Sequence, residues 1–292
     1  MKILIILTLL LWRIAPAALA EPPSGIRFDH SEWDQFLKKY VNEKGEVNYR
    51  TAKEDPSLLD AYLEKLRSFS LKEFFSWPRE ERLALLINAY NAGVVRTVLS
   101  HYPLKSIMQV PGGWEQSIVR IGHPLTAQSL KAQNKSGSSS ERAGARLSQS
   151  LNQIENGELR MGFRDEKILF ALCRGAKDSP RLRREAYEGS KVDGQLYLAA
   201  KEFANDEAKN HIVPGEKKVV LSRLFYWYAR DFLLNWSNVP VESKWAPEEL
   251  AVLSFFAHYL DDLKKVEYLE EGNYKVKYSI FNWDLNDGSP KA

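Results

Sequence analysis

The one thiol in this chain of 292 residues belongs to Cys173, which is followed by Arg174. A neighbouring positive charge lowers the pKa of a cysteine and favours the thiolate, which is the nucleophilic form. The apolar residues before it, Phe170–Leu172, are typical instead of a small buried residue. A nucleophile also needs a base, and no spacing rule ties Cys173 to any of the five histidines, which are His30, His101, His123, His211 and His258. A catalytic and a structural role for Cys173 therefore both stay open.

Two asparagines, Asn88 and Asn91, lie three residues apart in a segment whose spacing predicts a helix over residues 79–100. Residues three apart share one helix face, and asparagine is a poor residue for a helix interior. The pair either presents two amides to a ligand or hydrogen-bonds loop backbone that would otherwise be buried without partners. We keep both residues as ligand-binding candidates beside this structural alternative.

Asp231 stands beside Phe232 in a segment that is predicted to be helical. Burying its carboxylate without a partner would cost several kcal/mol, so a cation or several donors must meet it. The nearest rich source of cations in the sequence is the run Arg181, Arg183 and Arg184. We predict a structural ion pair with this run. A role in ligand binding or as a general base is the alternative for Asp231, and Arg174 is a further ligand-binding candidate.

Several kinds of site are absent from the sequence. It contains no metal-binding spacing, no phosphate loop and no Gly-x-Ser-x-Gly nucleophile elbow. A single cysteine allows neither an internal disulfide nor a thiolate metal cluster. The formal net charge of +3 is too small to indicate a nucleic-acid partner. We therefore expect no metal, no cofactor and no nucleic acid.

The first twenty residues have the pattern of a secretory signal peptide. Lys2 precedes an apolar run from Ile3 to Trp12, and Ala18 and Ala20 supply the small residues of a cleavage site. The run is shorter than the roughly 20 residues that span a bilayer. We expect cleavage after Ala20 and export to the periplasm or the extracellular space, with no membrane span in the mature chain.

The elements that must position these residues are mostly helices. Apolar spacing and Pro or Ser start signals predict helices over 28–40, after Asp55–Pro56, and over 78–101, 151–160, 168–172, 192–204, 222–236 and 247–259. Two β-hairpins are predicted around Pro214–Gly215 and around Gly272–Asn273, spanning 212–221 and 266–280. The prediction is an α-rich α+β fold, a single domain over 21–292 with two small β-hairpin elements.

Residues 127–150 differ in composition from their surroundings, with seven serines and two large aliphatic residues. Such a segment buries too little apolar surface to offset the entropy lost on ordering. We predict a Ser-rich mobile surface insertion.

The order of several segments resembles a bacterial and plant family called domain of unknown function 547, over nearly the whole mature chain. The segments that carry the resemblance are Gly45–Tyr49, Leu86–Ala92 with His101–Pro103 and Ser106–Ile107, Leu151–Arg160, Phe170–Leu182, Ala186–Tyr187, Leu221–Phe232 and Trp283–Asn286. The resemblance implies no established activity, cofactor or substrate. Plant members of the family resemble partner-binding proteins.

The chain departs from the family's usual pattern at the positions with the most reactive side chains. Asn156 and Leu169 stand where that pattern has histidines, and Arg174 and Ser179 stand where it has cysteines. If the family runs a Cys/His reaction there, this chain lacks the same residues.

Two functions from different classes remain. The first is a binding or scaffolding module of the cell envelope that holds a peptide or a polar small molecule near Asn88, Asn91, Arg174 and Asp231. The second is a hydrolase or acyl-transferase with Cys173 as nucleophile. No complete catalytic motif decides whether the protein is an enzyme.

Overall fold

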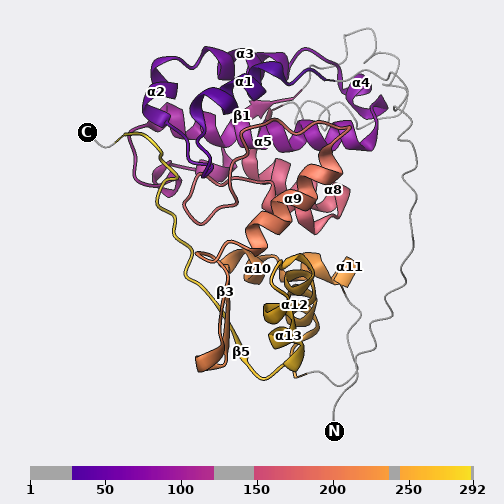
Figure 1. Cartoon of the computed structure of the whole chain (residues 1–292). Helices are drawn as coiled ribbons and strands as arrows, with labels where there is room; N and C mark the ends of the chain where they lie inside the picture. Colours follow the sequence, from indigo (N-terminus) through magenta and orange to yellow (C-terminus); the bar gives the residue numbers. More distant parts are fainter. Residues whose placement is uncertain (1–27, 122–147, 237–243, 291–292) are drawn as a thin grey trace.

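The computed structural model describes residues 28–121, 148–236 and 244–290. The predicted signal peptide, residues 1–20, lies outside the described residues, and so does most of the predicted insertion at 127–150. The last three residues of that insertion, Ser148–Ser150, form a strand. Figure 1 shows the described chain as a helical upper part and a lower part that combines helices with a sheet.

The upper part is built from the N-terminal helices, which pack against one long helix (Figure 1). The shorter helices are α1 (Ser31–Tyr40), α2 (Tyr49–Glu54), α3 (Ser57–Lys65) and α4 (Leu71–Ser76). Trp33, Phe36 and Tyr62 are buried, and the ring of Trp33 contacts those of Phe36 and Tyr62. Each such side chain stabilises the fold by about 1.5–3 kcal/mol. These helices and the long helix enclose the first hydrophobic core.

The long helix, α5 (Arg79–His101), begins after Trp77–Pro78, as predicted. Most of its side chains are buried, so its sequence is apolar around much of its circumference. Among the described helices it is the one that is long and apolar enough to span a membrane, yet 89% of its most apolar stretch is buried inside the protein. This composition is that of a core helix.

Short elements connect α5 to the lower part. They are η1 (Ile107–Gln109), η2 (Gly113–Glu115), β1 (Ser117–Arg120), β2 (Ser148–Ser150), the π-helix η3 (Gln153–Arg160), α8 (Met161–Phe163) and the 3₁₀-helix η4 (Glu166–Phe170). Strands β1 and β2 pair antiparallel in a two-stranded sheet. The segment predicted as a helix over 151–160 is therefore helical but largely of the π type, and of the predicted helix over 168–172 only the part up to Phe170 is helical, as 3₁₀.

The lower part begins with α9 and contains a second sheet. Its elements are α9 (Val192–Ala204), β3 (His211–Val213), η5 (Pro214–Glu216), β4 (Lys218–Leu221), α10 (Arg223–Trp227), η6 (Ala229–Phe232), α11 (Leu233–Trp236), α12 (Pro247–Tyr259), α13 (Leu263–Glu271) and β5 (Lys275–Tyr278). Phe170, Phe225 and Phe255 are in ring contact within the second hydrophobic core. The predicted hairpin around Pro214–Gly215 is confirmed as β3 and β4.

The second predicted hairpin, over 266–280, is wrong. Its first half lies in helix α13, and its second half contains β5, which pairs parallel with β4. Gly272 has φ of 68° and follows the helix end, so it is a left-handed helix cap instead of a hairpin turn. The prediction of an α-rich α+β fold is nevertheless confirmed, with two small sheets of two and three strands.

The segment after β5 connects the two cores. Phe281 is buried in the second core, Trp283 packs against both, and Leu285 is buried in the first. Beyond it, the backbone N–H of Gly288 donates to Val47 O at 2.9 Å. Figure 1 shows this segment running from β5 to the upper part, where the chain ends.

Candidate functional site

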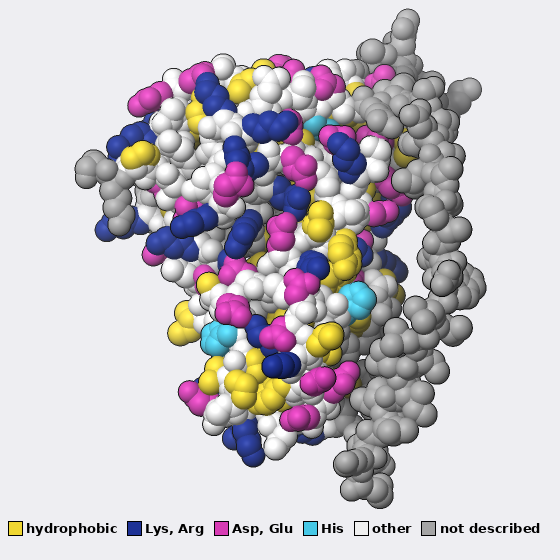
Figure 2. Space-filling model, viewed as in Figure 1, with side chains coloured by type: hydrophobic (Ala, Val, Ile, Leu, Met, Phe, Trp, Pro, Cys, Tyr) yellow, Lys and Arg dark blue, Asp and Glu magenta, His cyan; other side chains and the backbone are white. Residues whose placement is uncertain are grey.

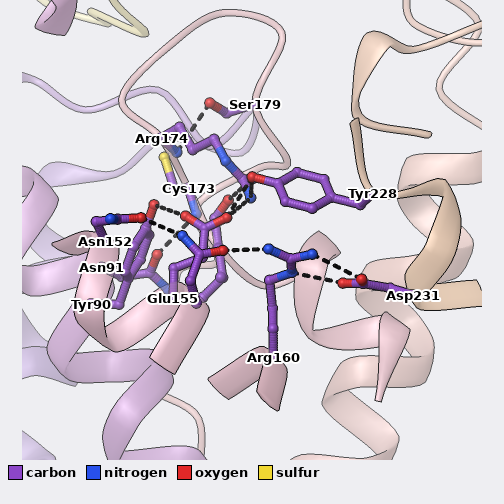
Figure 3. A network of polar contacts seen from close by, with 12 residues as sticks. Tyr90, Asn91, Asn152, Glu155, Arg160, Cys173, Arg174, Ser179, Tyr228 and Asp231 are labelled. Carbon is purple, nitrogen blue, oxygen red and sulfur yellow. Dashed lines mark hydrogen bonds and ion pairs between the residues drawn. The ribbon is translucent and has the colours of Figure 1, made fainter. Parts of the chain in front are cut away.

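A cluster of polar side chains lies where the two cores meet (Figure 3). We call it the junction network and define it as Tyr90, Glu155, Arg160, Arg174, Tyr228 and Asp231. Tyr90 comes from α5 and Tyr228 from the end of α10, while η3 carries both Glu155 and Arg160. π-helical segments are rare and frequently occur at functional sites, which makes this cluster the first place to look for chemistry.

Glu155 is the centre of the network. Its Oε1 accepts from Arg174 Nη2 and from the Tyr228 hydroxyl, each at 2.6 Å, and its Oε2 accepts from the Tyr90 hydroxyl at 2.9 Å. Its side chain is 8% exposed and that of Arg174 is 4% exposed. The pair is therefore a buried, hydrogen-bonded ion pair, in which removing one charge is far more damaging than removing both.

The charges of this pair hold each other ionised. Burial acts to raise the pKa of Glu155, but the charge of Arg174 and the hydrogen bonds from Tyr228, Arg174 and Tyr90 outweigh it and lower that pKa. Burial likewise acts to lower the pKa of Arg174, but Glu155 outweighs it and raises that pKa. A carboxylate held in this state is a poor general acid or base near neutral pH.

Asp231 forms an ion pair, as predicted, but with a different arginine. Its Oδ2 and Oδ1 accept from Nε and Nη2 of Arg160 at 2.7 and 2.8 Å, which is a bidentate arrangement. The guanidinium of Arg160 also lies 4.5 Å from the centroid of the Tyr228 ring. The predicted cations pair elsewhere: Arg181 with Asp206, Arg183 with Glu185 and Glu202, and Arg184 with Glu43.

Asn88 and Asn91 have the structural role, because both hydrogen-bond loop backbone. The amide of Asn88 donates to Tyr187 O at 2.8 Å and accepts from Tyr187 N at 3.0 Å. That of Asn91 donates to Ala171 O and accepts from Cys173 N, both at 2.9 Å. Both asparagines are buried, so each fastens a loop to α5. Arg174, a further ligand-binding candidate, is buried too, so these three side chains contact protein groups and not an open surface.

Cys173 is 2% exposed. Burial raises the pKa of its thiol to about 11, although the backbone of Gly175, the charge of Arg174 and the amide of Asn286 act in the opposite direction. Asn286 Nδ2 lies 3.5 Å from the sulfur. No histidine is a polar partner of this thiol in the part of the chain that the structure describes. The catalytic hypothesis requires an accessible thiolate beside a base, so the geometry favours the structural role.

The four positions at which the resemblance implies a departure, Asn156, Leu169, Arg174 and Ser179, lie around this region. Arg174 is the cation of the buried pair, and its backbone N–H donates to Ser179 Oγ at 3.0 Å. Asn156 Oδ1 accepts from Arg160 Nη1, which links it to Asp231. Leu169 is buried in the second core. Of the four positions, one thus holds an apolar residue and three hold residues that hydrogen-bond within the fold.

Residues 74–204 match the family model described as "Protein of unknown function, DUF547". The match confirms the resemblance over this part of the chain and assigns no activity. Searches of curated proteins and of solved structures found no match. Within the DUF547 segment lie α5, η3, Cys173 and Arg174, whereas Tyr228 and Asp231 lie beyond it. The junction network thus joins the matched segment to the part that follows.

The sequence did not single out four members of the junction network, which are Tyr90, Glu155, Arg160 and Tyr228, and Glu155 is the most important of them. It belongs to the quoted segment Leu151–Arg160, but a glutamate beside polar residues is typical of a solvated helix face. The available signal was Arg174 itself, because an arginine directly after an apolar run is prone to burial, and a buried cation requires a carboxylate nearby.

Open space lies elsewhere, along α1. Residues 181–190 of the DUF547 segment run beside this helix, with Ala186 N donating to Asp34 Oδ1 at 3.1 Å and Arg184 Nη2 donating to Lys38 O at 3.2 Å. The turn after α1 approaches closely at Gly45, which has φ of 77° and where a Cβ would lie 2.8 Å from Arg181 Cβ. Only glycine fits this position.

Two hollows flank residues 181–190, and together we call them the α1 groove. The arginine hollow, of about 560 Å³, lies at the C-terminal end of α1 and is lined by charged residues that include Lys38, Glu43, Arg181, Arg183, Arg184, Glu185 and Glu202. The acidic hollow, of about 440 Å³, lies at the N-terminal end and is lined by residues that include Asp29, His30, Asp34, Glu81 and Glu188. On the face drawn in Figure 2, side chains of both charges are interspersed over the upper part of the molecule.

Proposed function

We propose that the protein is an exported binding or scaffolding module of the cell envelope, which holds a short peptide or a polar small molecule in the α1 groove and performs no Cys-dependent reaction. The observation that carries the proposal is the contrast in access between two polar regions. The junction network is closed by its own hydrogen bonds, whereas the two hollows of the α1 groove are open.

The size and lining of the hollows support binding. Ligand sites in proteins are typically about 300–1,000 Å³, and volumes of about 560 and 440 Å³ fall in this range. The lining mixes carboxylates, guanidinium groups and small polar residues, which suits a zwitterionic ligand better than an apolar one. Two ion pairs at the hollows, Arg184 with Glu43 and Lys191 with Glu188, are exposed on both sides, so they are weak and can exchange for ligand contacts.

Export is supported by the first twenty residues alone, through the apolar run and the Ala18–Ala20 cleavage pattern. The expected result is a mature protein that begins at Glu21 and is recovered outside the cytoplasm. Mass spectrometry of the protein from fractionated cells checks this expectation. A full-length chain in the cytoplasmic fraction would contradict it.

Binding is tested with a synthetic pool of tripeptides whose ends are both free. We expect the full mature chain to retain members of the pool in affinity capture. In Arg184→Ala, retention should fall at least tenfold, since Arg184 lines the arginine hollow. Arg67→Ala is the matched control, because Arg67 pairs with Glu64 outside the groove. Absence of any retained peptide, or equal effects of the two variants, would refute the proposal.

The enzyme alternative has its own test. A thiol reagent added to the native protein at neutral pH should label Cys173 only as fast as the protein unfolds, because the thiol is buried and protonated. Denaturant should make labelling immediate. Rapid labelling of the native protein would revive the nucleophile hypothesis.

A further inference from the structure

The outward face of the second sheet carries positive charge. In β4 and β5 the side chains alternate between the second hydrophobic core and solvent, and Val219 and Val276 lie against the core. On the opposite face, the register places Lys218 of β4 beside Lys275 of β5, and Lys277 follows two residues further along β5. Like charges directly opposite each other on neighbouring strands destabilise a sheet. A bound anion would offset this cost.

One carboxylate partly neutralises these lysines. Glu216 pairs with Lys218, and the hydrogen bond and charge of Lys218, followed by the charge of Lys277, lower the pKa of Glu216. Lys275 and Lys277 form no ion pair with any residue that the structure describes. Positive charge on this face of the described chain is therefore left unpaired.

Apolar side chains are exposed next to these lysines. Ile280, two residues beyond β5, is 94% exposed, which is the largest value among the large apolar side chains that the structure describes. Tyr226 and Trp227, at the end of α10, are exposed too. The ring of Tyr226 lies 5.3 Å from that of Tyr278, in β5, and the ring of Trp227 lies 5.1 Å from that of Phe281. The lysines and the apolar side chains thus belong to one edge of the molecule.

A further cation lies beside the aromatic rings. The guanidinium of Arg223 is 4.7 Å from the centroid of the Tyr226 ring, and Arg223 forms no ion pair with the described residues. Figure 1 shows β5 and the segment that follows it along the left border of the lower part. We call this surface the β5 edge and define it as Arg223, Tyr226, Trp227, Lys275, Lys277 and Ile280.

Protection of an edge strand explains only part of this surface. β5 is an edge strand, and lysines on such a strand discourage pairing with another chain. An exposed isoleucine beside exposed tyrosine and tryptophan has the opposite effect, because contiguous apolar surface favours association. Cations beside exposed aromatic rings are typical of protein surfaces at the boundary between lipid and water, where Lys and Arg meet anionic headgroups and Trp and Tyr lie among them.

We propose that the β5 edge docks the protein on a membrane that contains anionic phospholipids. Its cations contact the lipid phosphates, its two exposed aromatic rings lie at headgroup depth, and Ile280 reaches the acyl chains. Charge complementarity selects this partner, because the whole chain has a formal net charge of only +3, whereas unpaired cations and exposed apolar side chains occur together at this edge. The inference goes beyond the proposed binding function and does not depend on the α1 groove.

The test is sedimentation of the mature chain with vesicles. Vesicles of phosphatidylcholine and phosphatidylglycerol in equal parts are compared with vesicles of phosphatidylcholine alone. We expect the wild-type chain to sediment with the anionic vesicles and to stay in solution with the neutral ones. Added salt should weaken the binding, because it screens the attraction between the cations and the headgroups.

Ile280→Glu tests the apolar contribution. Binding to anionic vesicles should weaken by about tenfold, because a carboxylate replaces the side chain that enters the acyl region. Met161→Glu is the matched control, since Met161 is 73% exposed on α8, away from β5 (Figure 1). Both substitutions change an exposed side chain, so the fold should be retained, which thermal unfolding checks.

Lys275→Gln/Lys277→Gln tests the charge. Binding to anionic vesicles should weaken by about fivefold for each lysine removed. The matched control is Lys44→Gln/Lys72→Gln, which removes the same charge from two exposed lysines of the upper part. A loss that depended on net charge alone would be equal in the two double variants.

Each outcome decides for or against membrane docking. A wild-type chain that stays in solution with anionic vesicles refutes it, and so does an equal loss of binding in a variant and its matched control. If the lysine variant binds weakly while Ile280→Glu binds like the wild type, the edge is a surface for soluble polyanions, and retention on immobilised polyglutamate would identify it as such. Capture of tripeptides by the α1 groove is measured separately, so either proposal can fail without the other.

Discussion

The junction network and the α1 groove are both rich in charged residues, yet they differ in how those charges are satisfied. At the junction, the oxygens of Glu155 are met by Arg174, Tyr228 and Tyr90, and little of the pair is exposed. In the groove, Arg184 and Glu43 pair while their side chains stay 41% and 84% exposed. Burial, and not the number of polar residues, separates a region that stabilises the fold from one that can take a ligand.

The two regions also differ in which parts of the fold they connect. The junction network joins η3 and the loop after η4 to α10 and η6, so it holds two hydrophobic cores together. The groove joins α1 to residues 181–190 around a single core. Substitutions at the junction should therefore affect the stability of the whole chain, whereas substitutions in the groove should affect binding.

The sharpest comparison is between Glu155→Gln and Glu43→Gln. Glu155→Gln leaves the buried charge of Arg174 uncompensated and should lower the free energy of unfolding by about 3–5 kcal/mol. Glu43→Gln, in the groove, should change it by less than about 0.5 kcal/mol. Urea denaturation measures both. The double variant Glu155→Leu/Arg174→Met should recover most of the loss, because it removes both charges; equal losses in the two single variants would erase the distinction.

The pH dependence of stability should differ between the regions. In the groove, burial lowers the pKa of His30 from 6.5 to about 4, so the unfolded chain takes up the proton first. Stability is then lost as the pH falls from about 6.5 to about 4, by about 3 kcal/mol from this group. The pKa of Glu155 is lowered in the folded chain, so the stability that this carboxylate contributes is lost only as the pH falls below the ordinary glutamate pKa of about 4.3.

Denaturation curves across this pH range test the assignment. His30→Phe should flatten the dependence between pH 6.5 and 4 and leave the loss below pH 4 in place. A wild-type stability that does not change between pH 6.5 and 4.5 would show that His30 is not buried as described.

Asn91→Ala sharpens the comparison for neutral side chains. It leaves Ala171 O and Cys173 N without their buried partner and should lower the free energy of unfolding by about 2–3 kcal/mol. Asn42→Ala, at the exposed turn that lines the groove, should lower it by less than about 1 kcal/mol. Chemical denaturation at pH 7 measures both, and an Asn91→Ala protein as stable as the wild type would reopen the ligand-binding interpretation.

Asp231→Asn is expected to have the smallest effect at the junction, about 1–2 kcal/mol, because its side chain and that of Arg160 are about one quarter exposed. For a protein of this size, that loss lowers the melting temperature by about 2–8 °C. Arg160→Gln should give a similar decrease, with little added by combining the two. Differential scanning calorimetry checks this, and an equal decrease in Arg181→Gln would restore the partner that the sequence suggested.

Local patterns predicted the helices well. Apolar spacing and start signals placed α5, α9 and α12, because most of what determines a long core helix lies within its own residues. The same reasoning failed around Gly272, since a glycine between two apolar segments suits a helix cap as well as a hairpin turn. Whether Gly272 ends a helix or forms a hairpin turn depends on the strand that β5 pairs with, and this strand, β4, lies about fifty residues earlier in the chain.

The candidate site was harder to predict. The structural reading of Asn88 and Asn91 followed from helix propensity, and the need of Asp231 for a cation followed from the cost of burying charge. Its actual partner, Arg160, is 71 residues away in sequence, whereas the predicted arginines were chosen for being nearer. The convergence of Glu155 with Tyr90 and Tyr228 depends on how three segments pack, which no local pattern encodes.

The segment after β5 has a consequence for cooperativity. Phe281 is buried in one core and Leu285 in the other, and Trp283 between them packs against both. Because one short stretch of backbone is anchored in both cores, loosening either core removes packing from the other. We therefore expect the two cores to unfold in a single transition.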